Sequence, residues 1–382
     1  MIVDRAWVKQ NLGFDPISTP APAATFATRA AAQKEPKDED FQREIIDFDS
    51  EGPEGSAFMA FSKATGLSRF VDIPWPKGLA PVTDTKVRKG KTGRLPNADF
   101  LVVTWTVDEG HALSRVLTPG KDSRDDYQPY RRNFAAISKK MRKGCPALEA
   151  NRLGAYWTTT IGGKKVVIFK SDSHMSQDGP QLANTDVWKQ IIEDVQPKLV
   201  ITTGTAGGIG THSEVGDVVV SAELRFDCTS KFKSKPFHSA SYSSKAANTA
   251  NFAKAKALFA TNADQLPPAN TRPPEIVTVA PGKLTSSVVT TDFFGFDTSD
   301  NHYHLQGLGD VSEMGDAVLG LVSRQMGASA PPYIAVRNVS DPQIDTTGLT
   351  LKEQAKMAAS IYKGFGRWSS VCSAIVCWAL IV

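Results

Sequence analysis

The chain has 382 residues, of which 41% are hydrophobic and 22% charged, with a formal net charge of +4 and four cysteines. This composition is typical of a globular protein with one large domain or two small ones. The charge is too small to indicate a nucleic-acid partner. The cysteines are too few for a disulfide scaffold and lack the spacing of a metal site, so we expect a cytoplasmic protein without a bound metal.

Residues 1–98 are predicted to form a largely irregular, partly disordered N-terminal extension. Residues 16–32 are rich in Pro, Ala and Thr, which indicates a mobile segment, with short ordered elements near 41–48 and 57–71. Five basic residues lie among glycines at 86–94. They indicate a solvated loop. The alternative interpretation is an arm that docks on an anion or on a partner. The first residues contain no long apolar stretch, so no signal peptide is expected.

Residues 99–382 alternate between strand and helix patterns, which predicts a single α/β domain. The predicted strands are 100–104, 156–160, 165–169, a strand from 199, 218–220, 286–290 and 333–336. The predicted helices are 108–116, 185–195, 313–326 and 351–362. We expect a mostly parallel, partly closed central sheet flanked by helices, with a hairpin at Gly162 and Gly163.

A glycine-rich segment, Leu-Val-Ile-Thr-Thr-Gly-Thr-Ala-Gly-Gly-Ile-Gly, occupies residues 199–210. It predicts a buried strand followed by an abrupt turn. Gly204, Gly207 and Gly208 remove side chains there, so that main-chain N–H groups can face an anion or a hydroxyl. The segment has neither the G-x-G-x-x-G pattern of a dinucleotide site nor the G-K-[ST] of a P-loop.

Three later segments complete the pattern. Ser-Glu-Met-Gly-Asp-Ala at 312–317 opens an apolar helix, and 334–341 is a buried strand that runs into a polar loop. The apolar tail at 371–382 has only about twelve residues, short of the roughly 20 that span a membrane. It therefore predicts a C-terminal helix docked on the core or on a partner subunit.

Several motifs occur in a fixed order, namely T-G-T-A-G-G with V-G-D-V-V-V-S, then E-M, then V-R-x-x-S-D. Through these motifs the chain resembles the nucleoside phosphorylase superfamily over roughly residues 99–378. That superfamily includes purine nucleoside phosphorylases, methylthioadenosine/S-adenosylhomocysteine nucleosidases and AMP nucleosidases. The resemblance implies a catalytic domain at 99–382, a small-molecule purine nucleoside or nucleotide as partner, no cofactor, and a homo-oligomer.

Cleavage of a purine N-ribosidic bond needs an acid, because the leaving base must be protonated at N7. Asp341 follows a buried strand and precedes Pro342, a place where burial raises the pKa of a carboxyl group. The resemblance implies that Asp341 protonates or hydrogen-bonds N7, and that Ser340 of the same motif binds the substrate. The alternative is an ordinary Ser-Asp-Pro turn.

Glu109 is the second candidate carboxylate. The resemblance implies that it helps to activate an attacking water, and the alternative is a carboxylate that stabilises a helix N-terminus. Thr205 and Arg337 match positions that surround the nucleophile, and Ala206 and Gly207 are assigned to substrate binding with them. Arg337 is equally explained as a structural ion-pair partner.

Glu313 and Met314 match the pair that lies against the ribose in the family. The next residue there is commonly a second glutamate, whereas this chain has Gly315 and then Asp316. Either Glu313 or Asp316 takes over the contact with the ribose hydroxyls, or the ribose is held differently. Phe294 is a candidate for stacking on the base, with core packing as the alternative.

Lys170 and His174 lie where many relatives carry a glycine turn after the third strand. They are candidates to bind the 5′-phosphates of a nucleotide, with the basic cluster 139–143 nearby. A solvated helix face is the alternative for that cluster. The first strand ends in Thr104 and Trp105 instead of glycine, which weakens the case for a phosphorylase.

The leading prediction is hydrolysis of the N-glycosidic bond of a purine nucleotide or nucleoside, with an adenine-type base preferred. A phosphate-dependent phosphorylase and a catalytically silent nucleoside-binding module are the alternatives. Stand-alone nucleotide-cleaving members of the superfamily occur as effectors in anti-phage defence, and the N-terminal extension raises that role here by fold-level analogy.

Overall fold

The computed structural model describes residues 1–18, 73–121, 126–175, 178–245, 251–261, 270–279, 282–283 and 286–382. The elements predicted at 41–48 and 57–71, and most of the segment 16–32, lie outside the described residues.

The strands are β1 (Ile2–Val3), β2 (Val82–Thr83), β3 (Phe100–Thr104), β4 (Gln128–Tyr130), β5 (Gly154–Ile161), β6 (Lys164–Ser171), β7 (Leu199–Gly208), β8 (Val218–Ser221), β9 (Glu223–Asp227), β10 (Ser241–Ser243), β11 (Ile276–Thr278), β12 (Ser287–Thr291), β13 (Gly309–Glu313), β14 (Tyr333–Asp341) and β15 (Gln343–Ile344). The helices are α1 (Arg5–Leu12), α5 (Val107–Leu117), α6 (Phe134–Ile137), α7 (Pro146–Glu149), α8 (Asn184–Val195), α9 (Phe252–Thr261), α10 (Asp316–Met326) and α11 (Leu351–Ile381).

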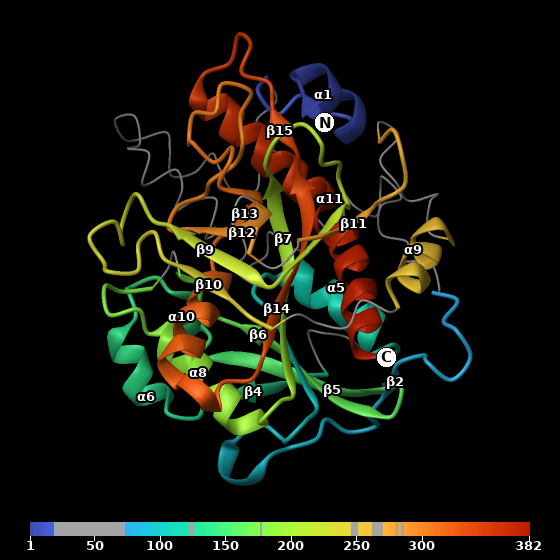
Figure 1. Ribbon diagram of the computed structural model, residues 1–382, viewed down its shortest axis with the longest axis vertical. Coiled ribbons are helices and arrows are strands. Elements are labelled where there is room, and N and C mark those ends of the chain that lie inside the picture. The colour runs from blue at the N-terminus through green and yellow to red at the C-terminus, as the bar shows by residue number, and fades with distance from the viewer. Residues whose placement is uncertain are drawn as a thin grey trace.

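Within the described chain, β2 to β14 form one 13-stranded sheet (Figure 1). Its centre is parallel, because β3 pairs in parallel with both β6 and β7, and β7 pairs in parallel with β14. Antiparallel pairs join β5 to β6, β8 to β14 and β13 to β7. The predicted α/β class with a helix-flanked central sheet is confirmed.

The sheet branches at β7, the strand that positions the pocket described below. Its first half lies between β3 and β14, whereas Gly207 and Gly208 pair with β13. Since the side chains of a strand alternate between its faces, two hydrophobic cores result. Val102 and Ile201 belong to a core with α5 and α11, and Leu101 and Val200 to a core with α8 and α10.

The hairpin at β5 and β6 is confirmed. Gly162 and Gly163 form its turn with φ of 54° and 78°, the left-handed values that a two-residue hairpin loop requires. The strands pair from Gly154 opposite Ser171 to Ile161 opposite Lys164. This hairpin ends at the pocket, because β6 carries Lys170 and Ser171 at its far end.

The abrupt turn predicted in the glycine-rich segment is wrong, because β7 continues as a strand through Gly208. The glycines instead permit close approach of carboxylates. A Cβ atom on Gly204 would lie 2.4 Å from Oε1 of Glu109, and one on Gly207 would lie 3.0 Å from Oδ2 of Asp341. Glycine inside a strand often marks such a close contact.

Two predicted boundaries also move. Glu313 ends strand β13, and helix α10 begins only at Asp316. The polar loop predicted before Asp341 is the last part of β14, whose register against β7 shifts between Val339 and Asp341. Such an irregularity re-aims a side chain at the end of a strand.

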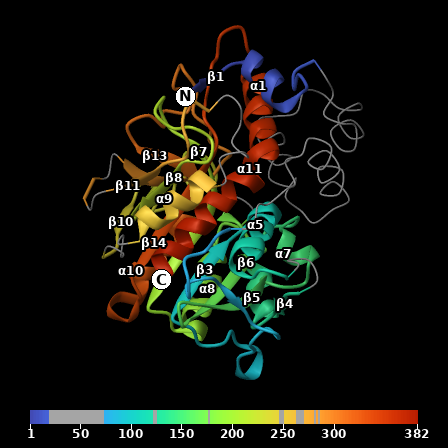
Figure 2. The same cartoon turned by 90° about the vertical axis from the view of Figure 1, so that its right-hand side faces the viewer.

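The two segments predicted at 351–362 and 371–382 form one continuous helix, α11. Thr350 and Glu353 make a capping box at its start, and Gly364 inside the helix admits Leu12 of α1 against its backbone. The helix runs along the sheet across β7 and β14 and beside α5 (Figure 2). Its predicted docking on the core is confirmed.

Among the described residues, α11 is long and apolar enough to cross a membrane, with a mean hydropathy of 1.3 over its most apolar 18 residues. Of that window, 89% is buried inside the protein, which is typical of a core helix.

The described parts of the predicted N-terminal extension pack on the remainder of the chain. Strand β1 pairs with β15, α1 packs against α11, and β2 pairs with β5. In the basic segment 86–94, Arg88 donates to Asp84 (2.7 Å) and to the carbonyl of Thr159 (2.8 Å). The other four basic side chains of this segment are exposed, as predicted for a solvated loop.

Replacing Gly204 with Ala should destabilise the fold by about 1–3 kcal/mol, because the new Cβ meets Glu109 and the backbone holds φ at 150°. Gly110→Ala is the matched control. The nearest atom to its Cβ is 3.7 Å away, and alanine is the better helix former by up to about 1 kcal/mol. Urea unfolding of both variants should give free-energy changes of opposite sign, and equal changes would contradict the close-approach argument.

Candidate active site

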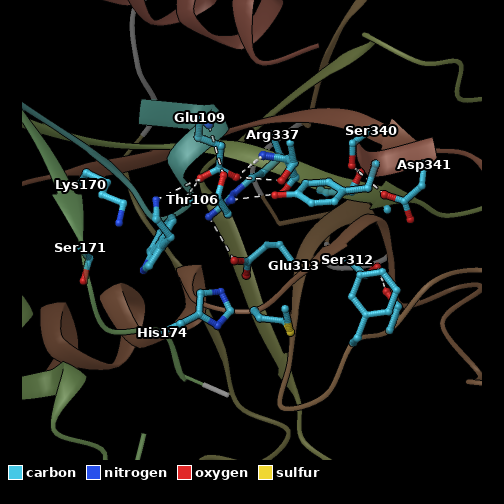
Figure 3. Close-up of a pocket in the computed structure, with 18 of the residues that line it drawn as sticks. Thr106, Glu109, Lys170, Ser171, His174, Ser312, Glu313, Arg337, Ser340 and Asp341 are labelled. Atoms are coloured by element: carbon cyan, nitrogen blue, oxygen red, sulfur yellow. Dashed lines mark hydrogen bonds and ion pairs between the residues drawn. The ribbon is translucent and has the colours of Figure 1, made fainter. Parts of the chain in front are cut away.

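A pocket opens where β3, β6, β7, β13 and β14 end, with about 950 Å³ of non-protein space including its mouth. The carboxyl ends of parallel strands are the usual place for a ligand in α/β sheets. Helix α11 adds Tyr362 to the wall. Figure 3 shows Lys170 at one end of the pocket and Asp341 at the other, with Glu109, Arg337 and Glu313 between them.

Glu109 is buried at the start of α5 and accepts five hydrogen bonds. Its Oε1 accepts from the N–H and the hydroxyl of Thr205, both at 2.8 Å. Its Oε2 accepts from Thr104 Oγ1 (2.6 Å) and from the N–H groups of Trp105 and Thr106. Burial opposes ionisation, but the charge of Arg337 and these donors hold the pKa of Glu109 below its usual value. Glu109 is therefore a carboxylate at neutral pH.

The predicted alternative for Glu109 also holds, since it forms a capping box with Thr106 at the N-terminus of α5. The structural and the chemical interpretations are compatible, because the carboxylate lines the pocket while it caps the helix.

Arg337 is the only cation in the centre of the described pocket lining, and it is 2% exposed. Its Nε donates to Oδ2 of Asp316 (2.8 Å), and its Nη2 donates to Oδ1 of Asp316 and to Oε2 of Glu313 (3.1 Å). The guanidinium lies 4.7 Å from the ring centroid of Trp105. The predicted ion-pair interpretation of Arg337 therefore holds in detail.

The sequence left open whether Glu313 or Asp316 faces the substrate, and the structure places these two residues differently. Glu313 lines the pocket and accepts from the N–H groups of Gly315 (2.6 Å) and Asp316 (2.9 Å). Burial and the neighbouring Asp316 carboxylate raise the pKa of Glu313, whereas Arg337 opposes the rise. Asp316 is fully buried and is absent from the pocket lining. The structure therefore does not bring Asp316 to the pocket with the other predicted residues, because its carboxylate pairs with Arg337.

The glycine at position 315 has a steric cause. A Cβ atom there would lie 2.9 Å from Cζ2 of Trp105. The indole occupies the space that a side chain at position 315 would need. Gly315 and Trp105 thus form one matched pair in the wall of the pocket.

Asp341 ends β14 and is 4% exposed. Its Oδ1 accepts from the hydroxyl of Ser340 (2.7 Å), which also donates to the carbonyl of Ala206. Burial raises the pKa of Asp341 to about 7, and the bond from Ser340 opposes the rise. Near neutral pH this carboxyl group holds its proton about half of the time, as an acid catalyst needs.

At the other end of the pocket, Nζ of Lys170 donates to Oδ1 of Asp172 (2.7 Å), whose Oδ2 accepts from Nε of Arg152 (2.5 Å). Burial, together with the charges of Arg337 and Lys231, lowers the pKa of His174 to about 4. His174 is therefore neutral near pH 7 and offers hydrogen bonds instead of the positive charge predicted for it.

The structure brings together all the predicted site residues except Asp316. The remaining set in the lining is Glu109, Lys170, His174, Thr205, Ala206, Gly207, Phe294, Glu313, Met314, Arg337, Ser340 and Asp341. Phe294 is half-buried, lines the pocket and lies 5.9 Å from Phe296 between ring centroids. The cluster at 139–143 is outside this lining, and Lys140 pairs with Asp186 on the surface, as its alternative predicted.

Sequence reasoning missed Trp105, Asp172 and Tyr362. Trp105 and Asp172 follow the strands β3 and β6 directly, and this position was a usable signal. Tyr362 reaches the pocket from α11, and no local pattern marks it. In the described part of the chain, no group of three His, Cys, Asp or Glu residues is arranged to hold a metal ion.

A family model described as the phosphorylase superfamily matches residues 129–365. The chain is similar to the 5′-methylthioadenosine/S-adenosylhomocysteine nucleosidase of Halalkalibacterium halodurans, with 33% identity over 72 residues, which are 19% of this chain and 29% of that protein. The enzyme of the same name from Chromohalobacter salexigens is 56% identical over 36 residues, 9% of this chain and 15% of that protein. The matched segments thus span less than a third of either relative.

Among solved structures, the chain is similar to a 5′-methylthioadenosine/S-adenosylhomocysteine nucleosidase from Helicobacter pylori, with 13% identity and a TM-score of 0.46. That match covers 73% of this chain and 96% of the other. A futalosine hydrolase from the same organism matches with 13% identity, a TM-score of 0.45 and the same two coverages.

Asp341 should make the stability of the protein depend on pH. Its pKa is about 7 in the fold and 3.8 in the unfolded chain, so the folded protein binds a proton that the unfolded chain releases. The free energy of unfolding should therefore fall as the pH rises from about 4 to about 7. Asp341→Asn is nearly isosteric and removes this contribution. Urea unfolding at pH 5 and pH 8 should show a smaller pH dependence in the variant, and equal dependence would contradict the raised pKa.

Proposed function

The chain belongs to the phosphorylase superfamily, and on this premise we propose that it hydrolyses the N-glycosidic bond of a purine nucleoside or nucleotide and releases the free base. The observation that carries the proposal is the charge at the centre of the pocket. Three buried carboxyl groups, those of Glu109, Glu313 and Asp316, surround the single guanidinium of Arg337.

Asp316 pairs with the guanidinium, which leaves the negative charge of Glu109 uncompensated, and Glu313, whose pKa burial raises to about 7, adds part of a charge. The pocket therefore favours positive charge on the substrate. As the bond between the sugar and the base lengthens, the sugar becomes oxocarbenium-like, and fixed negative groups in a buried site stabilise that charge. The same groups repel an inorganic phosphate dianion at the position of the nucleophile. The electrostatics therefore favour water over phosphate, and hydrolysis over phosphorolysis.

Asp341 supplies the proton that the leaving base needs. Its raised pKa leaves a substantial fraction of the carboxyl group protonated at neutral pH, and Gly207 leaves room for it beside β7. The bond from C1′ to N9 breaks with its electron pair moving to the purine, and N7 takes the proton of Asp341. Phe294 and Met314 line the same pocket and offer apolar surface to the base.

The water adds to C1′ near Glu109 and Thr205. A water that bonds to a cationic carbon becomes strongly acidic, so a weakly basic carboxylate suffices to take its proton. Glu109, with its pKa held low by Arg337 and its hydrogen-bond donors, then acts chiefly through its charge and by fixing Thr205. The products are free base and a sugar with a hydroxyl group at C1′.

An adenine-type base is supported by the two sequence relatives, both of which are nucleosidases named for adenine-containing compounds. A catalytically silent binding module is suggested by Gly315, which stands where the family commonly has a second glutamate. It is less favoured, since a buried acid with a pKa near 7 serves turnover more than binding. The defence role stays a prediction from analogy, because no contact in the described chain bears on it.

The proposal is tested by incubating the purified chain with adenine, guanine and uridine nucleosides and nucleotides, with and without inorganic phosphate. We expect free purine base at full rate in phosphate-free buffer, measured by chromatography, with no ribose 1-phosphate. A strict requirement for phosphate or arsenate would replace the proposal with phosphorolysis. Binding without any release of base would favour the silent module.

Asp341→Asn should lower turnover by about 10²-fold or more, the usual scale of general-acid catalysis. In the wild type, kcat should also fall as the pH rises above about 7, because the acid loses its proton there. The measurement is kcat from pH 5 to 9 for both proteins, with circular dichroism as the folding control. Turnover like that of the wild type in this variant would remove Asp341 from the mechanism.

Glu109→Gln should abolish most of the activity, because it removes negative charge beside the reacting carbon. Glutamine still fits the third position of a capping box, so α5 should persist. Asp108→Asn is the matched control, since it alters the same helix turn at a residue outside the pocket lining. If the two variants retain similar kcat/KM, charge at position 109 is not part of the mechanism.

A further inference from the structure

We propose that the end of the pocket opposite Asp341 is a phosphate subsite built around Lys170, so that the preferred substrate is a 5′-phosphorylated purine nucleoside. The inference rests on the proposed function and adds the substrate class to it. The recognised chemistry is a phosphate dianion, and the source to which we commit is the 5′-phosphate of a nucleotide.

Lys170 is placed to bind an anion inside the pocket. Its side chain is 9% exposed, and among the described residues its Nζ donates one hydrogen bond, to Asp172 at 2.7 Å. An ammonium group has three N–H donors, so two remain for a ligand. Asp172 also accepts from Arg152 at 2.5 Å. Because its charge is shared between two cations, it neutralises Lys170 only in part.

Ser173 lies beside Lys170 in the wall of the pocket. Its Oγ accepts from Nδ2 of Asn184 at 3.1 Å, and its hydroxyl is hydrogen-bonded to the thiol of Cys145. Ser171 donates its hydroxyl to the carbonyl of Ser173 at 2.9 Å. Both hydroxyl groups therefore have partners within the protein, and Lys170 is the residue that offers donors to a ligand here.

The electrostatics of this end differ from those of the centre. Around Arg337 carboxyl groups outnumber the one guanidinium, whereas at this end two cationic side chains, Lys170 and Arg152, share the carboxylate of Asp172. A phosphate dianion is therefore favoured at this end and disfavoured in the centre.

The order of groups along the pocket matches a nucleotide. Figure 3 shows Asp341 at one end, Glu109 and Arg337 in the middle, and Lys170 with Ser171 at the other end. In a β-nucleoside the base on C1′ and the 5′-carbon on C4′ lie on the same face of the sugar ring, on the two carbons that flank the ring oxygen, so the base and the 5′-phosphate extend from different ends of the ring. With the base at Asp341 and C1′ at Glu109, the 5′-phosphate extends toward Lys170.

The test compares kcat/KM for AMP and for adenosine in phosphate-free buffer. The wild type should prefer AMP by about 10-fold or more, the scale of one charge-assisted hydrogen bond. Lys170→Met should reduce the ratio of the two kcat/KM values by about 10-fold or more. It leaves the bond between Arg152 and Asp172 in place. Lys140→Met is the matched control, because it makes the same change at an exposed lysine outside the pocket, and its ratio should equal that of the wild type.

The subsite would be overturned if the wild type had the higher kcat/KM for adenosine, or if Lys170→Met lowered kcat/KM equally for AMP and adenosine. It would also be overturned if Lys140→Met changed the ratio of the two kcat/KM values as much as Lys170→Met does. Stimulation of adenosine cleavage by inorganic phosphate, with ribose 1-phosphate as product and loss of the stimulation in Lys170→Met, would assign the subsite to free phosphate and overturn the nucleotide proposal.

Calorimetric binding separates failure of the subsite from failure of the proposed function. If no substrate releases its base, the hydrolase proposal fails, but AMP should still bind more tightly than adenosine to the wild type. Lys170→Met should narrow that difference in affinity by about 10-fold. Equal affinities of the wild type for AMP and adenosine would overturn the subsite whatever the activity.

Discussion

The buried guanidinium of Arg337 is the interaction on which the site depends. It joins the middle of β14 to the start of α10 through Asp316, to the end of β13 through Glu313, and to the carbonyl of Thr205 on β7. A buried cation is costly unless it is paired and hydrogen-bonded, so these elements must meet with the correct geometry. The same network sets the charge of the pocket, because the N–H groups of Arg337 point in several directions and are bound by more than one carboxyl group.

Three glycines make this concentration of groups sterically feasible. Gly204 admits Glu109 against β7, Gly207 admits Asp341, and Gly315 admits the indole of Trp105. In each case the absence of a side chain leaves space for a residue from a distant part of the sequence. The fold and the chemistry are therefore coupled at the same residues, and larger side chains there would displace catalytic groups before they unfolded the chain.

Local patterns were enough to predict β3, the hairpin of β5 and β6, and α8, because hydrophobic periodicity and turn glycines act over a few residues. The ordered motifs also identified Glu109, Arg337 and Asp341, which the fold brings to one pocket. The remainder depends on long-range packing. Asp316 was predicted to contact substrate, whereas in the fold it pairs with Arg337 from a distant part of the sequence. The prediction also divided α11 into two segments, and the contact of Gly364 with Leu12 of α1 is one that no local pattern shows.

The central claim is that the pocket stabilises positive charge on the sugar. The most direct test is the dissociation constant of a purine nucleoside analogue whose sugar is replaced by a protonated pyrrolidine, compared with its neutral carbocyclic counterpart. Because a site complementary to the transition state binds its analogues more tightly, the cationic analogue should bind about 10²-fold or more tightly than the neutral one. Equal affinities, or preference for the neutral analogue, would contradict the account.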